Sequence, residues 1–163
     1  MTGAAETSTD ALSDEAEGGE KPSSVLFLCN HNVIRSPMAE GLLKNLAGTS
    51  IYVDSAGVTK GDVDTFVTAT MAELGINMAG HRPKTLEDLD DSWFDLIITF
   101  SPKAHHVALD MDVVEAGSVL YWPAADPTVA EGSRDILMAS YRDVRNHIKT
   151  RIEQYFSPML ETG

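Results

Sequence analysis

The sequence predicts an α/β fold: a three-layer sandwich in which a four-stranded parallel sheet is flanked by helices. Four short apolar or β-branched runs, at residues 25–28, 51–55, 96–100 and 118–121, have the length of strands. Segments with apolar residues at helical spacing separate them, and no hairpin signal joins consecutive strands. Such connections are typical of right-handed βαβ crossovers between parallel strands.

The first strand leads into the most informative stretch of the chain. It ends at Cys29, the only cysteine, and Arg35 follows six residues later. Ser36 is a predicted N-cap and Pro37 a suitable first helical residue. The 29–35 loop should therefore wrap a helix N-terminus, where unpaired amides and the helix dipole attract an anion. A thiol placed there should be a thiolate near neutral pH, because helix N-termini and nearby cations lower cysteine pKa values from ~8.5 to roughly 3.5–7.5.

The remaining elements follow from apolar spacing and breaker residues. After the strand at 51–55, which is broken at Gly57, an amphipathic helix covers 66–74 and stops at Gly75. A loop at 80–84 precedes the strand at 96–100. The chain then continues with a helix at 102–109, a strand at 118–121 and a long helix at 136–156.

Composition limits the classes of protein that fit. The 163 residues suffice for one domain, which we expect at 23–163 after a disordered acidic tail at 1–22. No apolar run approaches the ~20 residues that span a membrane, no signal pattern opens the chain, and a single cysteine suits a reducing compartment, so we expect a cytoplasmic protein without a membrane partner. The net charge of −13 argues against nucleic acid as a partner.

A candidate catalytic pair lies beyond two of the predicted strands. Asp126, followed by Pro127, comes just after the fourth strand, as Cys29 closes the first. The carboxyl ends of parallel strands meet at one edge of a sheet, where ligands of open α/β sheets bind. The planar guanidinium of Arg35 suits two oxygens of a tetrahedral oxyanion.

From about residue 24 to residue 156 the chain resembles the low-molecular-weight protein tyrosine phosphatases, whose fold the thioredoxin-coupled arsenate reductases share. The most specific marks are Cys29-x5-Arg35-Ser36-Pro37, Asp54-Ser55-Ala56-Gly57 and Asp126-Pro127. The resemblance implies a low-molecular-weight phosphatase-like domain that hydrolyses phosphomonoesters, phosphotyrosine or another aryl or small phosphate, through a phosphocysteine intermediate. The partner would be a phosphorylated protein or a small phosphate or oxyanion, and neither metal nor cofactor is needed.

The resemblance also assigns roles to residues. Cys29 would be the nucleophile, Arg35 would bind the phosphoryl group, and Asp126 would act as general acid and then as base. Ser36 would bond the sulfur, while Asn32, Ser55 and His81 would hold the loop in shape. Asn32 also has an argument of its own, because a loop whose amides converge on an anion needs a residue that tolerates positive φ. The residues expected to bind substrate are Asn30, His31, Asn32, Val33, Ile34 and Ser36.

Several residues differ from the family pattern at positions that affect which substrate can bind. Ile34 replaces a second loop cysteine, and Gly61, Thr128 and Val129 stand where aromatic residues usually wall the phosphotyrosine pocket. Without those rings, we expect a pocket that lacks a stacking surface for a phenyl group.

Two alternatives remain. The segments 84–86 and 141–149 look like the arsenate reductase branch, but Ser101 stands at the first relay cysteine, so reduction would need an external thiol. A non-catalytic phosphate- or phosphopeptide-binding module is the other alternative. The joint retention of Cys29, Arg35, Ser36 and Asp126 argues against it.

Overall fold

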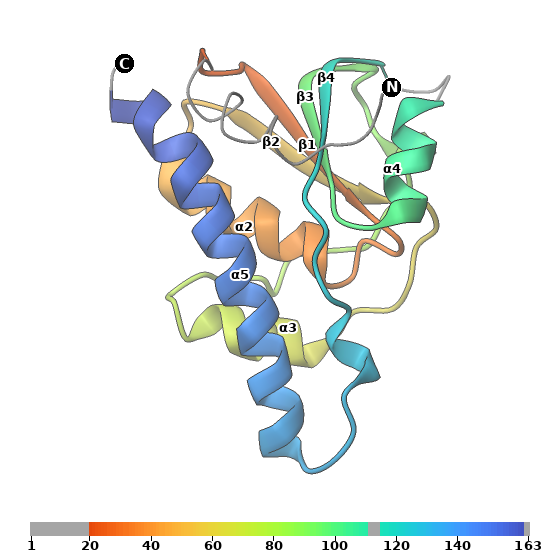
Figure 1. Cartoon of the computed structure of the whole chain (residues 1–163), viewed down its shortest axis with the longest axis vertical. Helices are drawn as coiled ribbons and strands as arrows, with labels where there is room; N and C mark the ends of the chain where they lie inside the picture. Colours follow the sequence, from red (N-terminus) through yellow and green to blue (C-terminus); the bar gives the residue numbers. More distant parts are fainter. Residues whose placement is uncertain (1–19, 111–114, 162–163) are drawn as a thin grey trace.

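The computed structural model describes residues 20–110 and 115–161, and its centre is one four-stranded sheet (Figure 1). All neighbouring strands are parallel, in the order β2-β1-β3-β4, which confirms the predicted fold class. The strands are β1 (Ser24–Cys29), β2 (Tyr52–Gly57), β3 (Trp93–Thr99) and β4 (Glu115–Tyr121). The predicted tail at 1–22 lies outside the described residues except for residues 20–22.

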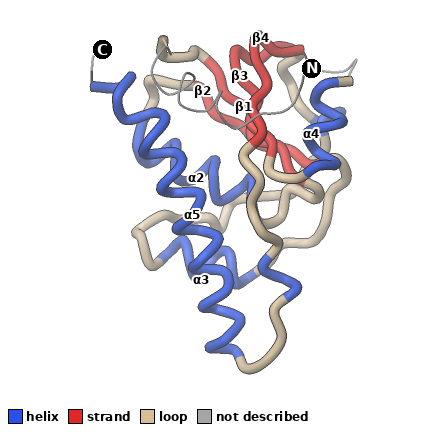
Figure 2. The backbone as a smooth tube through the Cα atoms, viewed as in Figure 1, coloured by secondary structure: helices blue, strands red, loops and turns tan. Residues whose placement is uncertain are grey.

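Helices cover both faces of the sheet and complete the three layers (Figure 2). The helices α2 (Arg35–Ala47) and α5 (Arg134–Glu161) pack together on one face, and α3 (Thr65–Ala72) packs against both of them. The opposite face carries α4 (Pro102–Leu109). The described residues also form two short 3₁₀ turns, η2 (Leu86–Asp88) and η3 (Pro127–Val129). None of the helices in the described part of the chain is long and apolar enough to cross a membrane.

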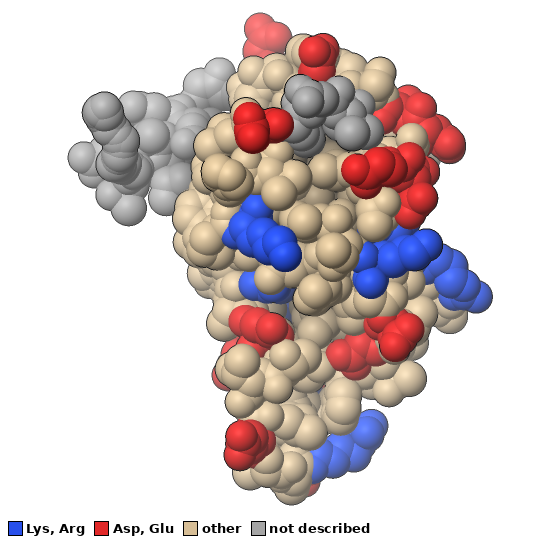
Figure 3. Space-filling view, turned by 90° about the vertical axis from the view of Figure 1, so that its right-hand side faces the viewer, with Lys and Arg blue, Asp and Glu red and all other residues tan. Residues whose placement is uncertain are grey.

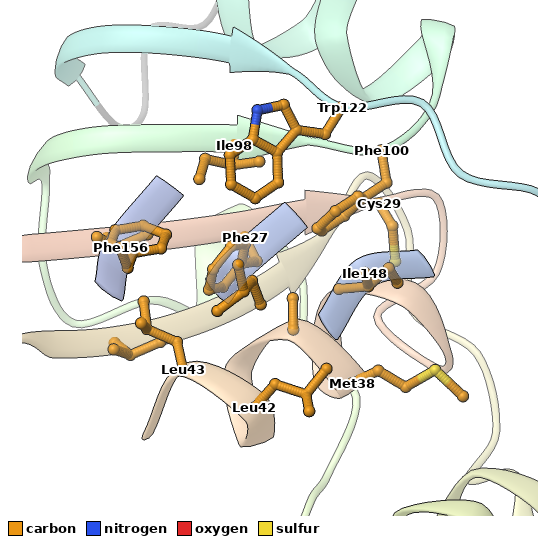
Figure 4. Packing of buried hydrophobic residues seen from close by; sticks show 14 of the residues in the cluster. Phe27, Cys29, Met38, Leu42, Leu43, Ile98, Phe100, Trp122, Ile148 and Phe156 are labelled. Atoms are coloured by element: carbon orange, nitrogen blue, oxygen red, sulfur yellow. The ribbon is translucent and has the colours of Figure 1, made fainter. Parts of the chain in front are cut away.

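The side chains of β1 alternate between two hydrophobic clusters, one on each face of the sheet. Val25, Phe27 and Cys29 belong to the larger cluster with α2 and α5, whereas Leu26 and Leu28 belong to the smaller cluster with α4. All five are buried, as expected for a central strand of a parallel sheet. Figure 4 shows Cys29 at the end of the larger cluster, so the thiol lies at the border of the core.

Several boundaries differ from the sequence prediction. The strand β3 begins at Trp93 rather than at residue 96, and α3 ends at Ala72 rather than at residue 74. β4 begins at Glu115 rather than at residue 118, because its register with β3 starts at the pair Trp93 and Glu115. The helix α2 begins at Arg35 with Ile34 as its N-cap residue and without a side-chain cap. The predicted cap role of Ser36 is therefore wrong, since this hydroxyl faces the thiol instead.

The predicted helix stop at Gly75 is confirmed. Gly75 has φ of 77°, and it follows α3 in a turn in which the amide of Ile76 bonds the carbonyl of Met71 at 3.1 Å. Glycine adopts this left-handed conformation without steric cost, so it ends the helical segment as predicted.

Charged side chains are unevenly spread over the surface. On the side that faces right in Figure 1, acidic residues gather toward one end, and basic residues occur in small separate groups (Figure 3). This face has no extended basic stripe among the described residues, in keeping with the acidic composition.

Candidate active site

The candidate site lies where the sheet changes its direction of winding. From β1 the chain crosses to β2 on one side, and β3 then pairs with β1 on the other side. Ligands of open α/β sheets bind at such a switch point, outside the carboxyl ends of the strands. Cys29 is the last residue of β1, and only 2% of it is exposed.

In the loop after Cys29 (residues 29–35, here the anion loop), the carbonyls and the amides differ in their hydrogen bonding. The carbonyls of residues 29, 30 and 31 accept hydrogen bonds of 2.9–3.1 Å from the amides of residues 58, 59 and 61. By contrast, no described residue accepts a hydrogen bond from the amides of residues 30–35. The loop carbonyls are thus satisfied from outside, while the amides remain available for an anion.

Asn32 is the centre of the support beneath the loop. It is fully buried with φ of 55°, the only positive φ outside glycine in the described residues, which confirms the conformation predicted for it. Its Nδ2 donates to the hydroxyls of Ser36 at 3.0 Å and Ser55 at 2.9 Å. Its Oδ1 accepts from the Lys84 amide at 3.0 Å, and its carbonyl bonds His81 Nε2 at 2.9 Å. The structure therefore brings together the residues that sequence reasoning grouped as loop supports.

Close approach of β2 to the loop requires glycine at position 57. A Cβ added to Gly57 would lie 2.6 Å from the Asn32 amide nitrogen and 2.3 Å from the Thr59 carbonyl oxygen. Real Cβ atoms do not approach main-chain atoms so closely. The absence of a side chain at Gly57 thus allows the loop to lie against the end of β2.

The Cys29 thiol and the Arg35 guanidinium each have one hydrogen-bond partner among the described residues. Cys29 Sγ lies 2.9 Å from Ser36 Oγ, so that hydroxyl can donate to a negatively charged sulfur. Arg35 is 9% exposed, and its Nη1 donates to the carbonyl of Ala124 at 3.0 Å. No other described residue accepts a hydrogen bond from this guanidinium, so its remaining N–H groups are free to bind an oxyanion.

Asp126 begins the η3 turn and is held by its own loop. Its Oδ1 accepts from the Thr128 amide at 2.9 Å and from the Thr128 hydroxyl at 2.6 Å. Burial raises the pKa of Asp126, but these bonds and the positive charges of Arg35 and His31 outweigh it and place the pKa below its ordinary value. Asp126 lines the same cleft as Cys29, His31 and Arg35.

A cleft of about 580 Å³ joins these groups. Its lining includes Cys29, Arg35 and Asp126, together with the predicted substrate-binding residues His31, Val33 and Ile34. The other predicted residues do not line this cleft: Asn30, Asn32, Ser36, Ser55 and His81. The side chain of Asn30, for example, accepts a hydrogen bond from Ser101 Oγ at 2.6 Å.

The expectation of a pocket without aromatic walls is wrong. Phe66 from α3 and Tyr141 from α5 both line the cleft, stacked with ring centroids 5.1 Å apart. Asp64 holds the pair, because its Oδ1 accepts from the Phe66 amide at 2.8 Å and its Oδ2 from the Tyr141 hydroxyl at 2.6 Å. Burial and the Asp64 carboxylate raise the pKa of Tyr141, which keeps this hydroxyl protonated.

Sequence reasoning assigned both rings to helix faces and overlooked their role in the cleft. Phe66 is the second residue of α3, just after the loop that borders the anion loop, and this position was the available signal. Gly61 and Thr128 line the cleft, but Val129 is 78% exposed and lies outside it.

The residues His105 and His106, which are adjacent in α4, do not contribute to the cleft. His105 Nδ1 bonds Thr99 Oγ1 at 2.9 Å, and its ring stacks on Tyr121. Within residues 20–110 and 115–161, no three His, Cys, Asp or Glu side chains are grouped closely enough to hold a metal ion.

The fold and the site together define an α/β protein with a buried thiol at the start of a loop whose amides are available for an anion. The model of the low-molecular-weight phosphotyrosine protein phosphatase family matches residues 24–162, and the chain belongs to this family.

Its relatives include both reductases and phosphatases. A glutaredoxin arsenate reductase from Synechocystis is 30% identical over 129 residues, which are 79% of this chain and 92% of that protein. The structure of an arsenate reductase from Archaeoglobus fulgidus is 35% identical with a TM-score of 0.62, covering 80% of this chain and 96% of its own. The tyrosine phosphatase AmsI from Erwinia amylovora shares the fold at 22% identity and a TM-score of 0.66, covering 86% and 95%.

Proposed function

We propose that the protein hydrolyses phosphomonoesters through a phosphocysteine intermediate, with aryl phosphates as its preferred substrates. One observation carries the proposal: Cys29, Arg35 and Asp126 line a single cleft whose wall includes a stacked aromatic pair. A nucleophile, an oxyanion ligand and a proton donor are the groups that such a reaction requires.

The first step transfers the phosphoryl group to sulfur. The Cys29 thiolate attacks phosphorus, the S–P bond forms and the bond to the leaving oxygen breaks. Amides of the anion loop and the free N–H groups of Arg35 bind the three equatorial oxygens, where negative charge is spread in the transition state. Asp126 gives its proton to the leaving oxygen, which departs as an alcohol or phenol.

The second step regenerates the enzyme. Water attacks the phosphocysteine, and Asp126, now ionised, accepts the proton of this water. The S–P bond breaks, inorganic phosphate leaves and Cys29 returns as a thiolate. The Ser36 hydroxyl, 2.9 Å from the sulfur, can donate to the thiolate as it departs.

The wall of the cleft favours a flat leaving group. Phe66, Tyr141 and Val33 present apolar surface in the same cleft as the thiol. Stacking of this kind contributes about 0.5–1.5 kcal/mol beyond the burial of apolar area. A phenyl ester, including phosphotyrosine on a protein, gains this contact, whereas a small alkyl phosphate does not.

Arsenate reduction is the second candidate, and the curated relatives at 30–31% identity favour it. The Cys29 thiolate would displace hydroxide from arsenate, and an external thiol would then attack Cys29 sulfur, which releases arsenite and leaves a mixed disulfide. A second external thiol would free Cys29 and form the external disulfide, so two thiols supply the two electrons. This route needs the anion loop but does not require Asp126 to protonate an ester oxygen.

A steady-state comparison separates the candidates. The purified protein is assayed with p-nitrophenyl phosphate, and separately with arsenate plus glutathione and glutaredoxin. We expect phosphatase turnover that Cys29→Ser abolishes and Asp126→Ala slows by roughly 10²-fold or more. Arsenate-dependent thiol oxidation that exceeds phosphatase turnover, and that Asp126→Ala leaves intact, would instead establish the reductase.

Lack of turnover in both assays by folded protein would leave phosphate binding as the function. Titration with inorganic phosphate, followed by the thermal unfolding midpoint, would then measure that binding. We further propose that residues 23–163 form a single catalytic domain. We also propose that it works in a reducing compartment such as the cytoplasm, where Cys29 stays a thiol.

A further inference from the structure

The two oxygens of Asp126 have different surroundings. Oδ1 accepts both hydrogen bonds from Thr128, at 2.9 Å from the amide and 2.6 Å from the hydroxyl. Oδ2 has no hydrogen-bond partner among the described residues, although Asp126 lines the cleft. The carboxyl group is therefore fixed at one oxygen and free at the other.

We propose that Thr128 is a positioning residue that directs the catalytic proton of Asp126 to Oδ2. This inference rests on the proposed phosphatase function. A carboxyl oxygen offers two lone pairs, and two donors from Thr128 already use those of Oδ1. A proton on Oδ1 would be repelled by the hydrogens of these two donors. The proton therefore occupies Oδ2, the oxygen available to the leaving group.

The local backbone holds Thr128 in place for this task. Asp126 is the N-cap of the η3 turn, Pro127 is buried at its first position, and the Pro127 carbonyl accepts a weak hydrogen bond of 3.4 Å from Ser140 of α5. The proline ring restricts φ, which limits the paths that the turn can take. The hydroxyl of residue 128 is therefore presented to Asp126 by a constrained turn.

Other charged groups around Asp126 act equally with or without the Thr128 hydroxyl. Arg35 from α2 and His31 from the anion loop favour its ionised form. Tyr141 from α5 is coupled to it by charge but donates its hydroxyl to Asp64. Loss of the Thr128 hydroxyl removes one bond to the ionised carboxylate, so it raises the pKa of Asp126 while these neighbours remain.

The test compares Thr128→Val, Thr128→Ala and Thr128→Ser. Valine keeps the β-branch without a donor, alanine removes hydroxyl and branch, and serine keeps the donor. Val129→Ala, an exposed change in the same turn, is the matched control. Each full-length variant is assayed for kcat/KM against pH with phenyl phosphate, whose leaving group needs a proton, and with 2,4-dinitrophenyl phosphate, whose leaving group does not.

We expect the valine and alanine variants to move the falling limb of kcat/KM with phenyl phosphate to higher pH. At the pH optimum, kcat/KM of these variants should fall roughly three- to tenfold with phenyl phosphate and less than about twofold with the dinitrophenyl ester. The loss with phenyl phosphate is only part of the rate enhancement that a general acid contributes. The serine variant and Val129→Ala should match the wild type in both respects.

Three results would overturn the inference: an unmoved falling limb in both deletion variants, equal losses with the two esters, or a serine variant as impaired as the valine variant. A fold defect would lower kcat/KM equally for the two esters and would also shift the thermal unfolding midpoint. It would therefore appear as equal losses with the two esters. Failure of the proposed function itself looks different, because wild-type protein would then hydrolyse neither ester.

Discussion

Replacement of Asn32 by alanine should both destabilise the fold and distort the anion loop. Asn32 combines a left-handed backbone, complete burial and three side-chain hydrogen bonds, to Ser36, Ser55 and the Lys84 amide. Alanine removes all three bonds and adopts the left-handed conformation less readily than asparagine. The loop would lose the contacts that hold its amides in a common direction.

The size of the effect follows from these terms. Each hydrogen bond contributes about 1 kcal/mol net, and a buried donor left unpaired, as the Lys84 amide would be, costs about 1–3 kcal/mol. The left-handed conformation adds about 1 kcal/mol for alanine. Counting the unpaired Lys84 amide in place of its lost bond, we expect Asn32→Ala to lower the free energy of unfolding by about 4–6 kcal/mol. It should also lower kcat/KM for p-nitrophenyl phosphate by at least tenfold, because small displacements of catalytic groups are costly.

Asn32→Gly provides an internal comparison. It loses the same hydrogen bonds but adopts φ of 55° without steric cost, so it should be more stable than the alanine variant, the reverse of the usual order. Urea unfolding measures stability, and steady-state hydrolysis measures activity. Asn45→Ala, at an exposed position of α2, should leave both unchanged. An alanine variant that unfolds within 1 kcal/mol of wild type, or that is more stable than the glycine variant, would refute this reasoning.

Three further variants test other parts of the structure. Gly57→Ala would place a Cβ within 2.6 Å of loop main chain, so its urea midpoint and kcat/KM should both fall, and wild-type values would contradict the packing described. Hydrogen bonds and charge from Arg142 and Arg145 lower the pKa of Glu73 to about 2, and a lowered acid pKa means stability that is present above pH 4.5 and lost as pH falls toward 2. Glu73→Gln should thus lower the urea midpoint at pH 7, and the difference from the wild type should shrink as the pH falls from 4.5 toward 2. A difference that does not change with pH would contradict this role of Glu73. Phe66→Ala should raise KM for p-nitrophenyl phosphate roughly three- to tenfold, while inhibition by inorganic phosphate stays unchanged. Equal weakening of substrate binding and phosphate inhibition would instead mean that the ring acts through the anion loop.

Local patterns were enough to predict the sheet and the anion loop. The apolar run before Cys29 has strand character whatever its neighbours, and a left-handed Asn32 follows from a loop that must turn its amides inward. Gly75 acts as a helix stop through its own backbone freedom. Such features depend on residues adjacent in sequence, and a single chain therefore reveals them.

Features that depend on tertiary packing were missed. Phe66 and Tyr141 lie 75 residues apart, and the packing of α3 against α5 brings their rings together in the cleft that Cys29 also lines. The cap of α2 was misassigned because a serine before a proline is a common N-cap, whereas the Ser36 hydroxyl bonds the sulfur and Asn32 within the fold. Gly117 hid the start of β4, since glycine is depleted in strands, and pairing with β3 extends the strand from the predicted residue 118 back to Glu115.

Trapping the covalent intermediate is the most direct test of the proposed chemistry. Protein in turnover with p-nitrophenyl phosphate is quenched in acid, digested and examined by mass spectrometry. The mechanism predicts one phosphoryl group on the peptide that contains Cys29, and no such group in the Cys29→Ser variant, which should also lack activity. Sustained turnover without a phosphoryl group on Cys29, or hydrolysis by Cys29→Ser at the wild-type rate, would contradict it.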